Sequence, residues 1–458
     1  YLVLIRGLKC PLQPIWGIFS SMSRSTEFFH FPYLDRYVCS FQIKFRCDFS
    51  TTISEVLRDR GWYQVGEDDE SWNLFWCEVN QLKMTLDEKR LNLHQRVPHF
   101  RNHYELTRKN LLARNLKRLK RQYIRDGRWD DVELCECMPL TFELPSDYLM
   151  FVEEYRKQPG ATWIVKPATG AQGRGIFLFQ RLKDLIEWRS AKDQANAANN
   201  LPGSTNPVQD SEQSQQDVYV VQSYIENPYL MAGRKFDIRI YVLVIEFLPL
   251  KVWIAREGFA RLSGSQYSLD VLGDNKIHVT NMAIQLRDLQ DSSCATSYKW
   301  SMRQLRVFLT ARHGATQVEE LIQRIANVVL ISLHSVENVI MHDRHCFELY
   351  GYDILLDSQL KPWLLEVNAS PSMTATDSDD YRLKYDMLTD LLNILDLEGR
   401  LKGTERRVGG FDLIWNNGPI WAACPGATDC YEHLHFYETR GAHSLHRLNT
   451  YLGAYDHT

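Results

Sequence analysis

Late in the chain, polar residues alternate within two apolar runs. Glu348–Asp357 and Lys361–Pro371 are separated by a short turn, and such runs predict an antiparallel β-hairpin. If the turn is tight, Leu364 lies opposite Asp353, and Glu366 is the diagonal neighbour of Asp353 on the same face. A hairpin fixes the direction of every side chain on both strands, so this stretch constrains the fold more than any other.

Three oxygen-bearing side chains meet on this hairpin. Glu366 and Asn368 are two residues apart, so their side chains share the strand face that Asp353 approaches. The neighbouring residues are apolar, and carboxylates are costly in such surroundings without a partner. Carboxylate and amide oxygens suit Mg²⁺, which completes its shell with water and phosphate. We therefore expect a magnesium site; the alternative is a solvated hairpin whose acids happen to alternate.

Composition places few limits on function. The 458 residues are enough for two or three subdomains. The apolar fraction of 44% and the charged fraction of 24% are ordinary for a soluble globular protein. The ten cysteines lack the paired spacing of a zinc site and are too sparse for a disulfide framework, which predicts reduced thiols in a cytosolic protein.

The first 40 residues predict an irregular segment. Residues 1–19 are apolar but too interrupted for a membrane span. The interrupting residues are Arg6, Lys9, Pro11 and Pro14.

Residues 41–145 predict a smaller N-terminal domain. Strands are expected at 41–45 and 72–77, with a capped helix at 51–60 between them. Residues 101–128 follow as a helical segment with an apolar stripe and ten basic residues against two acids. Such a field should attract a polyanion. Stacking aromatics are scarce, so an acidic peptide fits as well as nucleic acid; the alternative is a solvated helix face.

A glycine-rich loop lies between two short strands. The strands are expected at 162–167 and 176–179, and the loop at 168–175. A Walker loop leads into a helix instead and carries GK[ST], but the backbone N–H groups of a glycine flap can still cover phosphates. Lys166, just before the flap, can meet an α- or β-phosphate. Residues 190–217 are rich in small polar residues and predict a disordered insertion.

Charged residues alternate along the expected strand 235–244. Lys235, Asp237 and Arg239 share one face with Tyr241, and apolar residues occupy the other. Charges on a strand face are costly unless they line a charged cleft, and plain exposure is the alternative. Helices are expected near 301–313, 318–341 and 379–397, and residues 411–458 predict an irregular tail.

A strand is expected at 218–226, and the break Asn227-Pro228 after it resembles the hinge of a nucleotide site. In this order, the first strand, the lysine, the glycine flap, this hinge, the charged strand and the final hairpin resemble the ATP-grasp architecture. Six segments narrow the resemblance to the tubulin–tyrosine ligase-like family: 163–167, 224–230, 233–239, 278–281, 351–353 and 363–371. Phe100–Lys109 and Gly409–Trp415 resemble the polyglutamylase branch associated with cilia and flagella. The resemblance covers residues 41 to 418.

The resemblance implies an α+β ATP-grasp fold, in which two lobes clasp ATP after the smaller N-terminal α/β domain. The central lobe is expected at 146–230 and the C-terminal lobe, with the magnesium site, at 231–410.

The resemblance also assigns roles to single residues. Expected ATP-binding residues are Lys166, Gly170, Gln172, Gly173, Arg174, Gly175, Gln222, Ser223, Tyr224, Ile225, Lys235 and Asp237. Expected catalytic residues are Lys235, Arg239 and Arg261, and expected substrate-binding residues are Arg261, Thr280 and Asn281. Expected Mg²⁺ ligands are Asp353, Glu366 and Asn368.

The implied activity is ATP-dependent addition of glutamate, through isopeptide bonds, to glutamate side chains of tubulin tails. The expected cofactors are ATP and Mg²⁺, and the expected partners are tubulin, free glutamate and accessory subunits, without nucleic acid or a membrane. The expected location is the cytoskeleton, at the axoneme and basal body of a cilium or flagellum. A glycine ligase of the same family, a non-catalytic microtubule-binding scaffold and a small-molecule phosphotransferase stay open as alternatives.

Overall fold

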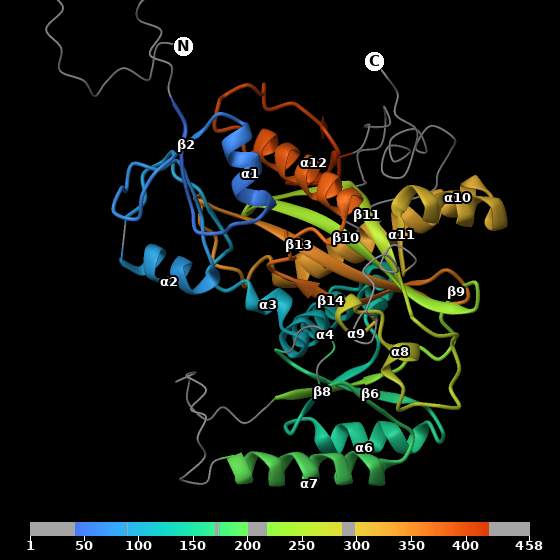
Figure 1. Ribbon diagram of the computed structural model, residues 1–458. Coiled ribbons are helices and arrows are strands. Elements are labelled where there is room, and N and C mark those ends of the chain that lie inside the picture. Colours follow the sequence, from blue (N-terminus) through green and yellow to red (C-terminus); the bar gives the residue numbers. More distant parts are fainter. Residues whose placement is uncertain are drawn as a thin grey trace, which may run out of the picture. The chain divides into compact units, whose positions relative to one another are not determined.

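The computed structural model describes residues 42–88, 90–169, 173, 175–199, 218–285 and 298–420 (Figure 1). These residues form a mixed α+β structure with three sheets, which confirms the expected fold class at that level. The expected irregular segment at 1–40 and most of the expected tail lie outside the described residues. In the part of the chain that the structure describes, no helix is long and apolar enough to cross a membrane.

The first sheet belongs to the N-terminal region and is parallel. Its strand order is β2 (Tyr63–Gln64), β1 (Lys44–Cys47) and β3 (Leu74–Trp76). The helices of this region are α1 (Thr52–Asp59) and α2 (Val79–Glu88). Thr51 caps α1, because its side chain accepts a hydrogen bond from the Ile53 N–H.

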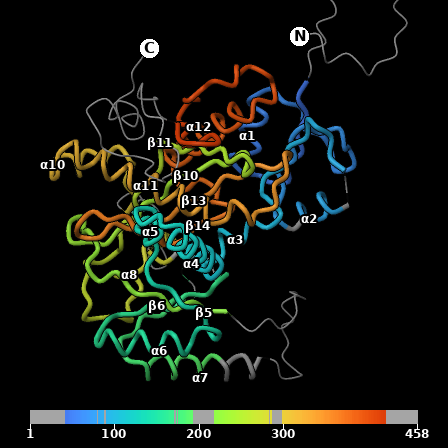
Figure 2. Tube along the Cα trace, turned by 180° about the vertical axis from the view of Figure 1, so that it is seen from behind, coloured from blue at the N-terminus to red at the C-terminus, as the bar shows by residue number. Residues whose placement is uncertain are grey.

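The second sheet is antiparallel and carries the predicted strand pair around the glycine loop. Its order is β5 (Thr141–Leu144), β8 (Tyr219–Ser223), β6 (Trp163–Pro167) and β7 (Phe177–Phe179). Helices α6 (Tyr148–Lys157) and α7 (Leu182–Asn199) cover one face, where Phe151 and Leu185 pack against Trp163 (Figures 1 and 2).

Helix α7 extends further than the sequence predicts. Residues 190–199 were expected to belong to a disordered insertion, but they continue this helix. The alanines in that stretch favour a helix, and the preceding turns are anchored because the Trp188 ring stacks on Phe177 at 5.9 Å. The prediction was wrong for residues 190–199, and the rest of the predicted insertion, 200–217, lies outside the described residues.

The third sheet is the largest. Its main path runs β14 (Pro362–Asn368), β13 (Cys346–Leu356), β10 (Arg234–Phe247), β11 (Leu250–Leu262), β16 (Phe411–Asn416) and β15 (Arg407–Val408). Three short strands pair with its members: β4 (Val97–Pro98), β9 (Leu230–Met231) and β12 (Lys299–Ser301).

Strand β16 is a second correction. Residues 411–416 were expected to begin an irregular tail, but they pair with β11 and bury Phe411 and Leu413. The strand is short and follows two glycines, so it lacks a clear period in the sequence.

Helices cover both faces of the large sheet. On one face, Ile238 and Ile240 pack with α11 (Ala315–Val336) and α4 (Lys109–Arg125). On the other, Tyr241 and the rest of the second cluster pack with α12 (Ser378–Leu395) and the first sheet. The expected alternation along β10 is therefore confirmed. The remaining helices are α3 (Tyr104–Thr107), α5 (Trp129–Leu134), η1 (Cys135–Cys137), α8 (Asn275–His278), α9 (Met282–Gln285) and α10 (Met302–His313).

The predicted hairpin is present as β13 and β14, but its register differs. Leu364 faces Ile354, and after a register shift Glu366 faces Asp353 directly. The irregularity adds Leu365 to one strand, as a β-bulge does. The expected pairing of Leu364 with Asp353 was wrong, and the two carboxylates are cross-strand neighbours.

Candidate active site

A pocket between the second and third sheets collects most of the predicted site residues. Its lining includes Lys166, Gly173, Gln222, Ser223, Tyr224, Ile225, Lys235, Asp237, Arg261, Thr280, Asn281, Asp353 and Glu366. Arg239 and Asn368 contact these residues from neighbouring positions. Gly170, Gln172 and Arg174 lie outside the described residues. Segments as far apart in the sequence as Lys109 and Glu366 therefore meet at one place, as a nucleotide-binding cleft requires.

Glycine is required at one described flap position. Gly173 has φ +70°, and a Cβ there would collide with the Ile284 side chain. Gly175 has φ +72° and lies beside Pro167, at the end of β6. Both conformations strain any other residue, so the loop that follows Lys166 depends on its glycines.

Lys166 is buried at one end of the pocket. Its Nζ donates to Gln222 Oε1 at 2.7 Å, and Gln222 Nε2 donates to Thr141 Oγ1 at 2.8 Å. Burial lowers the pKa of Lys166 to about 8. The Lys166 ammonium is thus held in place by a neutral amide, which does not neutralise its positive charge.

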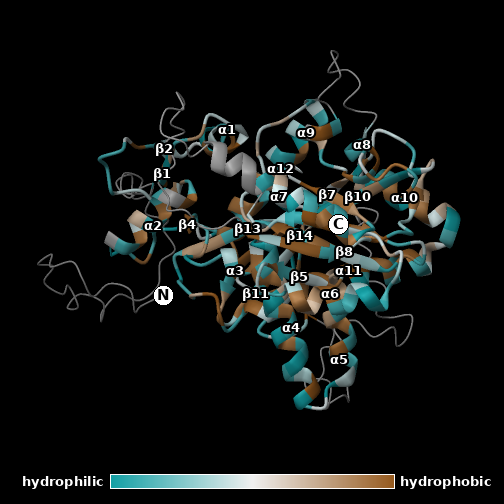
Figure 3. Ribbon diagram, turned by 90° about the horizontal axis from the view of Figure 1, so that it is seen from below, coloured by the Kyte–Doolittle hydropathy of each residue, from teal (hydrophilic) through white to brown (hydrophobic). Residues whose placement is uncertain are grey.

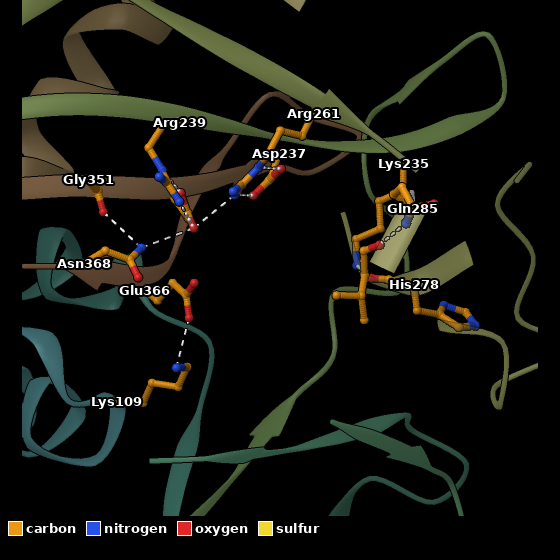
Figure 4. Close-up of polar contacts among 12 residues, drawn as sticks. Lys109, Lys235, Asp237, Arg239, Arg261, His278, Gln285, Gly351, Glu366 and Asn368 are labelled. Atoms are coloured by element: carbon orange, nitrogen blue, oxygen red, sulfur yellow. Dashed lines mark hydrogen bonds and ion pairs between the residues drawn. The ribbon is translucent and has the colours of Figure 1, made fainter. Parts of the chain in front are cut away.

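Lys235 has a similar setting on β10. Its Nζ donates to the Tyr224 hydroxyl and to the His278 carbonyl, both at 2.9 Å, and Tyr224 Oη lies 2.9 Å from His278 Nδ1. Burial and, to a smaller extent, the nearby charge of Lys166 lower the pKa of Lys235 to about 7. Figure 4 shows Lys235 pointing toward His278 and away from the arginines.

The other end of the pocket holds interlocked arginines and aspartates. Arg261 forms a two-point ion pair with Asp237, its neighbour across the strands. Arg239 does the same with Asp353, also a cross-strand neighbour, with Nη2 to Oδ2 at 3.0 Å. Arg261 Nη2 lies 3.0 Å from Asp353 Oδ2 as well, which joins the two pairs (Figure 4).

These contacts keep Asp353 charged. Burial would raise the pKa of Asp353, but Arg239 and Arg261 outweigh burial and hold it well below its usual range. The carboxylate is therefore ionised at neutral pH, as a metal ligand must be.

Glu366 and Asn368 complete the group on β14. Asn368 Nδ2 approaches Asp353 Oδ2 at 3.4 Å and the Gly351 carbonyl at 3.3 Å. Glu366 Oε2 forms an ion pair with Lys109 Nζ at 2.9 Å (Figure 4). The predicted face of the hairpin thus brings the three side chains together.

The residues matched by the family model of the tubulin-tyrosine ligase family are 84–401, more than half of the chain. The chain belongs to the tubulin-tyrosine ligase family. Among its relatives, a probable tubulin polyglutamylase TTLL9 of Rattus norvegicus is 46% identical over 392 residues, which cover 82% of this chain and 85% of the relative. A probable tubulin polyglutamylase ttll-9 of Caenorhabditis elegans is 44% identical, covering 84% and 87%. A probable alpha-tubulin polyglutamylase Ttll1 of Tetrahymena thermophila is 37% identical, covering 83% and 94%.

Lys109 is a charged residue of the pocket that was not predicted from the sequence. In the sequence it belongs to the basic segment at 101–128. In the structure Lys109 begins α4, is buried, and reaches Glu366. A signal was present, because Lys109 ends the stretch Phe100–Lys109 that carried part of the family resemblance.

The donor set fits Mg²⁺ in its chemistry. The described residues contain no group of three or more His, Cys, Asp or Glu that could hold a metal by themselves. Asp353 and Glu366 with the Asn368 amide supply hard oxygens, but too few for an all-protein cage. That suits Mg²⁺, which is commonly bound by one or two carboxylates together with substrate phosphates. Lys109 and the two arginines already neutralise the carboxylates. A cation that arrives with phosphate would therefore bind carboxylates that also stay paired with these basic side chains.

Proposed function

We propose that this protein is an ATP-dependent tubulin polyglutamylase that joins glutamate to glutamate side chains of tubulin tails. One observation carries the proposal. Two buried lysines bonded to neutral partners face a ring of arginines and carboxylates across one pocket, in a chain whose relatives are named polyglutamylases. This arrangement supports an ATP-grasp fold in which the nucleotide binds between the second and third sheets.

The proposed reaction has two steps. The tail carboxylate takes the γ-phosphoryl group of ATP, and ADP leaves. The amine of free glutamate then attacks the acyl phosphate, the C–N bond forms, phosphate leaves and the amine loses a proton. Phosphorylation is needed because a carboxylate is a poor electrophile.

The chain's own residues would hold the charges in this sequence. Lys166 and Lys235 would bind ATP phosphates, and Arg239 and Arg261 would orient phosphate and carboxylate oxygens in pairs. Asp353, Glu366 and Asn368 would hold Mg²⁺. When bound, Mg²⁺ offsets negative charge on the transferring phosphoryl group. Thr280 and Asn281 line the same pocket and would close it around substrate.

The proposed setting follows from the substrate. Tubulin and free glutamate would be the partners. The resemblance of Phe100–Lys109 and Gly409–Trp415 to the branch associated with cilia and flagella would place the chain on the axoneme or basal body. Accessory subunits are further candidate partners in the same proposal.

A single incubation tests the function. Tubulin, ATP, Mg²⁺ and isotope-labelled glutamate are combined with the chain, and the tails are read by mass spectrometry. We expect label in the tails only when ATP is present. Labelled glycine in a parallel reaction decides against the glycine ligase if it is not incorporated. Absence of both labels, with tubulin still bound, would favour the scaffold.

A further inference from the structure

The loop that follows the proposed magnesium ligands is attached to the N-terminal part of the chain. Asn368 is the last residue of β14, and its pairing with Gly351 is the last of the register. A strand end beyond its ladder opens easily. The position of Asn368 therefore depends on how the next residues, 369–374, are held.

A histidine from far upstream makes the first attachment. His99 Nδ1 lies 2.9 Å from Glu348 Oε1, and His99 Nε2 lies 3.2 Å from Ser370 Oγ. Because a carboxylate accepts hydrogen bonds, Nδ1 carries the ring proton and Nε2 accepts from the Ser370 hydroxyl. Ser370 is two residues after Asn368, so the histidine holds the chain just past the proposed metal ligand.

The histidine and the glutamate are themselves fixed. The Glu348 Oε2 atom accepts from the Tyr350 hydroxyl at 3.0 Å and from the Phe100 N–H at 3.1 Å. The side chains of His99 and Glu348 are 8% and 0% exposed. His99 also has φ +74°, a costly conformation that persists where the surroundings determine it. The ring is therefore oriented before any ligand binds.

Two further contacts tie this loop to its neighbours. The Thr52 hydroxyl of α1 donates to the Met373 carbonyl at 3.0 Å. A Cβ at Gly351 would lie 3.2 Å from Pro371 Cβ and 3.3 Å from Arg239 Cδ, so the loop, β13 and this arginine are in close contact there. A shift of the loop would therefore change both the arginine end of the pocket and the proposed metal site.

Apolar packing covers only part of the loop. A cavity of about 430 Å³ lies against it, and its lining includes Trp76, His99, Phe347, Ser370 and Met373. Open space on this side leaves the loop with fewer packing contacts. The hydrogen bonds at Ser370 and Met373 therefore matter more for its position than they would in a filled core.

We propose that His99, fixed by Glu348, holds Ser370 and thereby positions Asn368 for Mg²⁺. His99 is a positioning residue, because it acts through the serine. The N-terminal region would then set the geometry of the metal site as well as contribute to the fold. This inference rests on the proposed function, since Asn368 is a metal ligand only if the proposed magnesium site is correct.

The test compares Ser370→Ala with the unchanged chain. This variant keeps the buried pair of His99 and Glu348 and removes only the hydroxyl that the ring holds. Each chain is titrated with Mn²⁺ in the presence of ADP, and the bound ion is measured by electron paramagnetic resonance. We expect the Kd for Mn²⁺ to rise about tenfold, as when a group that orients a metal ligand is lost, with little change in Tm. Ser370→Thr should restore most of the affinity.

A second variant tests whether the histidine acts through the serine. His99→Asn removes the ring, and asparagine tolerates a positive φ better than most residues. Both changes break the same bond, so His99→Asn alone and His99→Asn with Ser370→Ala should have the same Kd for Mn²⁺. Additive losses would mean that the two residues act separately, which overturns the proposal.

His334→Asn is the matched control. His334 also pairs with a glutamate, Glu337, at 2.7 Å, but it belongs to α11 and does not line the pocket. It should keep the Mn²⁺ affinity whatever its effect on Tm. If Ser370→Ala keeps that affinity as well, His99 serves the fold alone and the proposal is wrong.

Two other outcomes would also contradict the proposal. A glutamyl adduct on Ser370, detected by mass spectrometry during turnover, would make this serine a nucleophile instead of an anchor. An unchanged chain that binds no Mn²⁺ with ADP would reject the proposed magnesium site, and with it both this inference and the proposed function. Normal binding by the unchanged chain and by Ser370→Ala rejects the inference alone.

Discussion

The two ends of the pocket treat positive charge in opposite ways. At one end, Lys166 and Lys235 are bonded to an amide, a hydroxyl and a carbonyl, and neither belongs to the ion pairs of the described residues. At the other end, Arg239 and Arg261 are each clamped by a carboxylate on the neighbouring strand. The side-chain chemistry fits this division, because a buried lysine can lose its proton whereas an arginine stays charged.

The difference separates two tasks. A buried lysine without a carboxylate pays for desolvation until an anion arrives, so it favours binding of a phosphate-bearing ligand. A clamped arginine is already satisfied, so it contributes fixed geometry and a stable fold. We therefore expect substitutions at the lysine end to affect ATP affinity more than stability, and substitutions at the arginine end to affect both.

The largest expected effect is at the carboxylates. Glu366→Gln keeps the size of the side chain but removes a charge from the proposed metal site. We expect glutamate incorporation to fall by roughly 100-fold or more, since a bound metal supplies several kcal/mol of stabilisation to the transition state. Incorporation is measured by mass spectrometry of the tails, and the fold by circular dichroism.

A matched control tests whether the metal site or the ion pair matters. Glu136 also pairs with a lysine of α4, Lys120, at 2.6 Å, but it is exposed and does not line the pocket. Glu136→Gln should keep full activity. Full activity in Glu366→Gln would exclude Glu366 as a metal ligand.

Methionine substitutions compare the two ends directly. Arg261→Met leaves the buried Asp237 without its clamp, and breaking such a pair costs about 3–5 kcal/mol of unfolding free energy. Lys235→Met removes a buried cation along with its hydrogen bonds, so we expect a change of about 1 kcal/mol or less. Urea unfolding measures both, and ATP binding should weaken strongly in Lys235→Met. Equal losses of stability in Arg261→Met and Lys235→Met would mean that the two ends of the pocket do not differ in their contribution to the fold.

The lysine end predicts a pH dependence of ATP binding. Burial lowers the pKa of Lys166 to about 8 and that of Lys235 to about 7, and phosphate binds the protonated forms. Affinity should therefore be highest at low pH and fall as pH rises above these values, by about tenfold per pH unit for each lysine. Calorimetry between pH 7.5 and 9, in buffers of different ionisation enthalpy, should show proton uptake. Lys235→Met should remove part of that uptake.

The same lowered lysine pKa values make the stability of the ligand-free protein rise with pH, whereas they make ATP affinity fall. The unfolded chain has lysines with an ordinary pKa near 10.4, so between about pH 7 and 10 it binds more protons than the folded chain. This contribution to stability rises with pH.

An ATP affinity independent of pH would mean that both lysines keep their charge in the free protein.

The sequence predicted the side chains of the site better than their pairing. Glu366 and Asn368 share a face because strands alternate, and that rule needs no tertiary information. The bulge that moves Glu366 opposite Asp353 was not predictable, since register depends on what packs against both strands. The clamp of Arg261 on Asp237 was also missed. It requires β10 and β11 to pair in one register, which the order of residues does not specify.

The basic helix gave the least reliable expectation. Its residues were treated as one surface for an acidic peptide, but several are used within the fold. Hydrophilic and hydrophobic residues alternate along α4 (Figure 3). Lys117 donates to the Thr141 carbonyl and lies 5.1 Å from the Phe142 ring centroid, and Arg118 donates to the Ser335 carbonyl at 2.8 Å. Changing them to glutamate would test packing as much as binding. Arg121 and Arg125 are exposed on the same helix.

The smallest expected effect is therefore at these two exposed arginines. Arg121→Glu with Arg125→Glu should weaken tubulin binding only a few-fold, because exposed charges are screened at physiological salt and act mainly on association rate. The effect should shrink as salt rises, while Tm and ATP affinity stay unchanged. Microtubule co-sedimentation at two salt concentrations measures it. Lys117→Glu with Arg118→Glu should instead lower Tm, because it breaks contacts to β5 and α11. If the exposed pair has no effect at low salt, tubulin is held at the pocket and its clamped arginines, without help from α4.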